Sequence, residues 1–117
     1  MAKILISDDS EFMRKVVREI LEKNGYTDII EASNGEEAIE AYDQHKPDLV
    51  LLDIIMPEKD GTEVLSDIVP KGAKVLNITA VGQESMIKKA TALGSLGYII
   101  KPFDEEMVIS EVKKIIG

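Results

Sequence analysis

Short apolar runs alternate five times with segments whose apolar residues recur at helical spacing, and this alternation strongly constrains the fold. The apolar runs are strand candidates, and they lie at 4–6, 29–30, 49–52, 75–78 and 98–100. The segments with helical spacing follow them at 12–21, 38–42, 64–69, 86–93 and 107–116. Five strands that alternate with five helices across short connections predict an α/β fold with a doubly wound parallel sheet.

The third strand candidate, Leu49 to Leu52, is apolar at every position. Such a run is typical of a central strand buried on both faces, as a parallel sheet requires. Asn34 and Asp104 stand where helix N-caps belong. We expect Phe12 and Met107 to lie on the inner faces of the first and last helices. Asn77 lies inside the fourth strand candidate, and no sequence pattern explains it.

Composition excludes several classes of function. The 117 residues suit one domain, 1–117, and too few follow Lys101 for an attached output domain. There is no cysteine and only one histidine, which excludes thiolate and multi-histidine metal sites. A net charge of −8 disfavours direct nucleic-acid binding. No apolar run approaches the ~20 residues that a membrane span needs, and no signal peptide is present, so we expect a cytoplasmic protein. We also expect it to be a monomer.

Polar side chains stand at the carboxyl ends of four strand candidates. Asp8 and Asp9 end the first, Asp53 the third, Thr79 the fourth and Lys101 the fifth. Taken singly, each has an ordinary structural explanation as a cap, a turn residue or a solvated side chain. Open α/β sheets bind ligands outside the carboxyl ends of their strands, so the coincidence favours a functional site.

Three carboxylates about 5 Å apart repel one another by roughly 3 kcal/mol per pair at an effective dielectric of 20. Such a cluster persists when a cation neutralises it or when one acid is protonated. Oxygen donors without histidine or cysteine select a hard cation, and the absence of calcium-loop spacing favours Mg²⁺ over Ca²⁺. Lys101 and Thr79 would add an ammonium and a hydroxyl donor for a phosphoryl group. Asp53, at the end of the central strand, is the predicted nucleophile.

These residues match a known family in order and spacing over essentially the whole chain. The matching segments are Asp8-Asp9, Asp53 with Met56-Pro57 and Gly61, Thr79-Ala80, and residues 98–103. Together they resemble the receiver domain of two-component response regulators. The stretch 8–14 is also similar to the stand-alone, CheY-like chemotaxis members. The resemblance implies a flavodoxin-like fold with strand order 2-1-3-4-5.

The resemblance also implies roles for individual residues. Asp53 would be phosphorylated by a histidine kinase of the CheA-like type, with Mg²⁺ as the cofactor. Asp9, Asp53 and the backbone carbonyl of Ile55 would bind Mg²⁺ directly, and Asp8 would act mainly through water. The phosphoryl group would contact the Thr79 hydroxyl, the Ala80 amide and Lys101. The Lys101–Pro102 bond is expected to be cis.

The same resemblance implies a switch. Phosphorylation would draw the Thr79 hydroxyl inward, and the Tyr98 ring would turn into the space beneath it. The surface of the fourth helix, fifth strand and fifth helix would then control a downstream protein, a motor component or an adaptor in chemotaxis. The chain would catalyse only its own phosphorylation and dephosphorylation, so we do not expect an enzyme acting on other substrates.

Three alternatives remain open. A single-domain phosphorelay intermediate would pass its phosphoryl group to a histidine phosphotransfer protein and would share the same active site. An aspartyl phosphohydrolase generally needs an acid two residues after the nucleophile, where this chain has Ile55. A flavin-binding module would place a hydroxyl-rich phosphate loop where Asp8-Asp9 would repel the phosphate.

Overall fold

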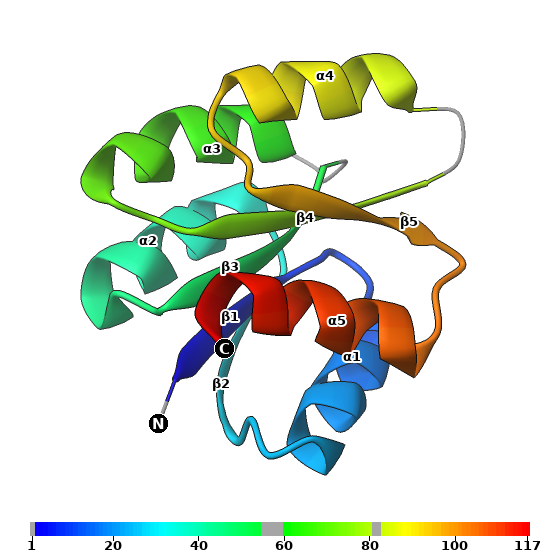
Figure 1. Ribbon diagram of the computed structural model, residues 1–117. Helices are drawn as coiled ribbons and strands as arrows, with labels where there is room; N and C mark the ends of the chain where they lie inside the picture. The colour runs from blue at the N-terminus through cyan, green and yellow to red at the C-terminus, as the bar shows by residue number, and fades with distance from the viewer. Residues whose placement is uncertain (1, 55–59, 81–82) are drawn as a thin grey trace.

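A computed structural model describes residues 2–54, 60–80 and 83–117. One five-stranded sheet runs through it in the order β2-β1-β3-β4-β5, and every neighbouring pair is parallel (Figure 1). This is the predicted fold. The strands are β1 (Lys3–Ser7), β2 (Asp28–Ala32), β3 (Leu49–Asp53), β4 (Val75–Ala80) and β5 (Gly97–Lys101).

The helices lie on both faces of the sheet (Figure 1). They are α1 (Glu11–Lys23), α2 (Gly35–His45), α3 (Gly61–Ile68), α4 (Glu84–Ala92) and α5 (Glu105–Ile116), with a 3₁₀ turn at Val69–Lys71. Buried residues of α2, α3 and α4 pack in one apolar cluster, and those of α1 and α5 pack in another. Strand β3 is buried throughout and supplies alternate side chains to the two clusters, as its apolar run predicted.

Several local predictions are confirmed. The side chain of Asn34 accepts a hydrogen bond from the Glu37 N–H, and that of Asp104 accepts one from the Met107 N–H. Both are therefore N-caps. The Lys101–Pro102 bond is cis.

Of the helices in the described segments, none combines the length and hydropathy that a bilayer crossing needs.

Two helix positions differ from the prediction. Phe12 and Met107 are 72% and 43% exposed, so neither lies in the core. Each belongs to the first turn of its helix, which begins at the carboxyl edge of the sheet. The strands end there, so these first turns have no sheet beneath them to cover an apolar side chain.

Asn77, unexplained by the sequence, is buried and bridges two strands. Its Nδ2 donates to the carbonyl oxygen of Leu52 on β3 at 3.1 Å. Leu52 is its register partner in the β3–β4 ladder. The Asn77 Oδ1 has no hydrogen-bond partner among the described residues. The structure therefore accounts for a hydrogen bond donated by the Asn77 amide.

Candidate functional site

The three predicted acids meet at the carboxyl edge of the sheet. Strands β1 and β3 are neighbours with Ser7 opposite Leu52, so the residues that follow them emerge side by side. Asp8, Asp9 and Asp53 each place one carboxylate oxygen within 4.8 Å of the others. Asp8 and Asp53 are buried, whereas Asp9 is exposed. Unless a cation lies among them, three such carboxylates repel one another strongly.

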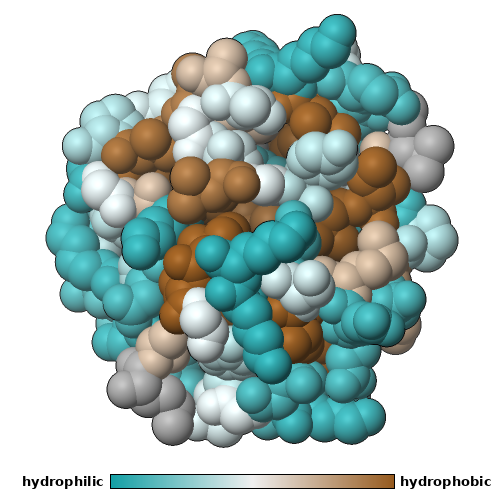
Figure 2. All heavy atoms as spheres, viewed as in Figure 1, coloured by the Kyte–Doolittle hydropathy of each residue, from teal (hydrophilic) through white to brown (hydrophobic). Residues whose placement is uncertain are grey.

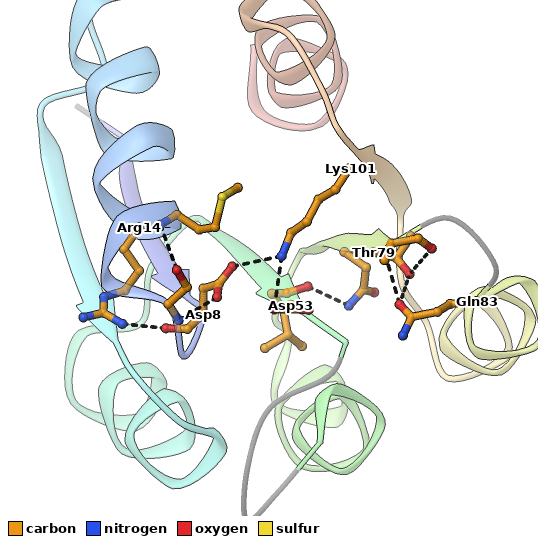
Figure 3. Close-up of polar contacts among 11 residues, drawn as sticks. Asp8, Arg14, Asp53, Thr79, Gln83 and Lys101 are labelled. Atoms are coloured by element: carbon orange, nitrogen blue, oxygen red, sulfur yellow. Dashed lines mark hydrogen bonds and ion pairs between the residues drawn. The ribbon is translucent and has the colours of Figure 1, made fainter.

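Lys101 reaches this cluster from β5, at the far side of β4. Its Nζ lies 3.3 Å from Asp53 Oδ2 and 3.5 Å from Asp8 Oδ2 (Figure 3). One ammonium beside three carboxylates leaves two negative charges uncompensated, and one divalent cation would balance them. The donors are all oxygens, so the residues fit the hard ion Mg²⁺ better than a transition metal.

Asp8 is held in one orientation by groups from α1. The Ser10 N–H donates to Asp8 Oδ1 at 2.9 Å, and this leaves Oδ2 to face Lys101. Arg14 donates from Nη1 to the Asp8 backbone carbonyl at 2.6 Å (Figure 3). The Nε of Arg14 lies 3.0 Å from Glu31 Oε1. Sequence reasoning did not assign Arg14 to the site, because an arginine in the first turns of a helix is usually solvated.

Gly61 allows the start of α3 to pass directly behind Asp53. A Cβ at Gly61 would lie 2.6 Å from Ile54 Cα and 2.8 Å from the Asp53 carbonyl oxygen. Asp60, the N-cap of α3, accepts hydrogen bonds from the Thr62 hydroxyl and from the N–H groups of Thr62 and Glu63. These bonds, the Thr62 hydroxyl foremost, hold the pKa of Asp60 below its ordinary value.

Thr79 and Ala80 lie at the end of β4, next to the acids along the sheet edge. The buried Thr79 Oγ1 donates to Gln83 Oε1 at 2.8 Å, and the Ala80 N–H donates to the same oxygen at 3.0 Å. Sequence reasoning missed Gln83, since a single amide in a loop carries no pattern. Tyr98 is 48% exposed on β5, opposite Asn77 in the β4–β5 register.

One predicted ligand and part of one motif are not placed. The backbone carbonyl of Ile55 and the Met56-Pro57 pair lie outside the described residues. The structure thus brings together Asp8, Asp9, Asp53 and Lys101, with Thr79 and Ala80 on the neighbouring strand end.

Comparisons with known proteins agree with this arrangement. The family model for the response regulator receiver domain matches residues 4–113. The chemotaxis protein CheY of Bacillus subtilis is 41% identical over 98% of both chains. The CheY of Halobacterium salinarum is 45% identical over 99% of this chain and 98% of its own. The solved receiver domain of NtrX from Brucella abortus has a TM-score of 0.92 at 27% identity, covering 97% of this chain and 98% of that one.

Proposed function

The chain belongs to the response regulator receiver domain family of two-component systems, and we propose that phosphorylation of Asp53 switches its binding to a partner protein. The observation that carries the proposal is the position of the Asp53 carboxylate, 3.3 Å from Lys101 and within the acid cluster. A nucleophilic carboxylate beside a fixed ammonium and a divalent cation site suits phosphoryl transfer.

The proposed reaction takes a phosphoryl group from a phosphohistidine of a CheA-like histidine kinase. A carboxylate oxygen of Asp53 forms the new bond to phosphorus, while the bond from phosphorus to the imidazole nitrogen breaks. The imidazole leaves with the electron pair of that bond and takes up a proton. Lys101, already beside Asp53, would pair with the transferred group.

Asp8, Asp9 and Asp53 would hold Mg²⁺, with Asp8 acting mainly through water. The cation would supply positive charge to the phosphoryl oxygens during transfer. The Ser10 N–H would keep the Asp8 carboxylate oriented toward this position, and Arg14 would hold the Asp8 backbone through its carbonyl. The carbonyl of Ile55 stays a predicted ligand.

The output surface is proposed to be formed by α4, β5 and α5. Leu96, Tyr98 and Met107 are exposed apolar side chains on or beside these elements. Figure 2, viewed from the same side as Figure 1, shows hydrophobic residues reaching the surface among hydrophilic ones. Inward rotation of Tyr98 upon phosphorylation would change this surface. The Tyr98→Ala variant should then accept a phosphoryl group normally yet lose phosphorylation-dependent partner binding.

A role in chemotaxis is favoured over the phosphorelay alternative by the names of the relatives. Several full-length relatives between 38% and 45% identical bear the name chemotaxis protein CheY. We infer a motor component or an adaptor as the downstream target. We expect the chain to act as an enzyme only on its own aspartyl phosphate.

Incubation with Mg²⁺ and a small acyl phosphate donor tests the proposal. The wild-type mass should rise by one phosphoryl group, and the gain should disappear in Asp53→Asn or when the metal is chelated. Phosphorylation of Asp53→Asn to the wild-type level would place the reaction elsewhere and refute the assignment.

A further inference from the structure

Gln83 occupies an unusual position at the start of α4. It is the N-cap residue of that helix, yet its side chain makes no capping bond. The side chain turns back to β4, where its Oε1 accepts from both the Thr79 hydroxyl and the Ala80 N–H (Figure 3). The two donors proposed to bind a phosphoryl group are thus already bound to one amide oxygen.

Each of these donors has one proton to give. The Thr79 hydroxyl is fully buried, so an acceptor at this position offsets the cost of its burial. The Gln83 oxygen lies 2.8 Å and 3.0 Å from the two donors, and a phosphoryl oxygen would need the same protons at similar distances. Engagement of the phosphoryl group and of Gln83 by these donors is therefore mutually exclusive.

We propose that Gln83 is an internal competitor of the phosphoryl group, a positioning residue that holds Thr79 and Ala80 until Asp53 is phosphorylated. The inference rests on the proposed function and adds a regulatory contact to the same site. The Gln83 backbone carbonyl accepts from the N–H groups of Met86 and Ile87. Release of its side chain would therefore directly affect the first turn of α4, which is part of the proposed output surface.

The first measurement uses the protein without metal or phosphoryl group. Gln83→Met keeps the size of the side chain and removes the acceptor. Amide hydrogen exchange at Ala80, followed by NMR, should become several-fold faster in Gln83→Met. The matched control is Gln44→Met, on the exposed surface of α2, which should leave Ala80 unchanged. Equal protection of Ala80 in wild type and Gln83→Met would refute the contact.

The second measurement titrates the protein with beryllium fluoride in the presence of Mg²⁺, as a non-hydrolysable stand-in for the phosphoryl group. Gln83→Met should bind it about three- to tenfold more tightly than wild type, because two hydrogen bonds need not be broken first. Gln83→Glu offers a charged acceptor and should bind it more weakly than wild type. Gln44→Met should match wild type.

A double variant locates the effect. In a Thr79→Val background the gain from Gln83→Met should shrink, since one of the two donors is already absent. Unchanged affinity in Gln83→Met, with wild-type binding intact, would overturn the competition while leaving the phosphorylation proposal standing. Failure of wild type to bind beryllium fluoride better than Asp53→Asn would instead overturn the proposed function, and the Ala80 exchange would still test the Gln83 contact.

Discussion

Removing one charge from the acid cluster should stabilise the metal-free protein. Asp9 is the best position, because it is exposed and its side chain accepts no hydrogen bond from the described residues. Its carboxylate approaches those of Asp8 and Asp53 within 4.8 Å. At the dielectric constant of water each pair repels by about 0.9 kcal/mol. We therefore use Asp9→Asn, which keeps the shape of the side chain.

The expected gain is small but measurable. The two repulsions sum to about 2 kcal/mol. Loss of the attraction between Asp9 and the Lys101 ammonium beside the cluster, and of a favourable negative charge near the start of α1, together offset about 1 kcal/mol of this gain. Asp9→Asn should thus raise the free energy of unfolding by about 1 kcal/mol in low salt with a chelator. At 1 M salt the screening length falls to about 3 Å, and the gain should diminish.

Urea unfolding followed by far-UV circular dichroism provides the assay, since the chain has no tryptophan. Asp28→Asn, at an exposed position of β2, is the matched control, because it reduces the net negative charge of the chain by the same amount without touching the cluster. Mg²⁺ at 100 times its dissociation constant should stabilise wild type by about 2.7 kcal/mol and Asp9→Asn by less. Equal gains from Asp9→Asn and Asp28→Asn would refute the reasoning from clustered charge.

Three further predictions concern the framework around the site. Asp60→Ala should lower the free energy of unfolding by about 1 kcal/mol at pH 7 by removing the N-cap of α3. Because the folded pKa of Asp60 is lowered, urea titrations should show the difference present above its ordinary value of 3.8 and lost as pH falls through the lowered value. Gly61→Ala should cost more than about 2 kcal/mol, since its Cβ would meet the β3 backbone, whereas Gly25→Ala, with φ +91° and open space, should cost about 1 kcal/mol in the same titration. Asn77→Asp should lower the free energy of unfolding by about 3 kcal/mol at pH 7, because it buries an unpaired charge. The loss should be smaller at pH 4, and equal losses in thermal unfolding at both pH values would contradict this.

Much of the fold follows from periodicity. The all-apolar run at Leu49 to Leu52 predicted the central strand, and polar residues at strand ends predicted which side chains would meet. The helix limits at Asn34 and Asp104 followed from capping chemistry. These features depend on local sequence or on the general geometry of parallel sheets.

What the sequence could not predict depends on which surfaces meet. Phe12 is apolar at a helical position, but only the structure shows that the sheet ends before reaching it. The donor of Asn77 is satisfied by Leu52, a residue 25 positions away on a neighbouring strand. Gln83 and Arg14 enter the site through long flexible side chains, whose direction no residue pattern specifies.

The bridge from Lys101 to Asp8 joins residues 93 positions apart. Lys101 ends β5, Asp8 follows β1, and β3 and β4 lie between these two strands. Synthesis must therefore proceed 93 residues beyond Asp8 before this pair can form. Any fragment that ends before β5 would carry Asp53 without its ammonium partner. The proposed phosphorylation of Asp53 would then wait until β5 has been synthesised, which would keep incomplete chains from drawing phosphoryl groups away from finished ones.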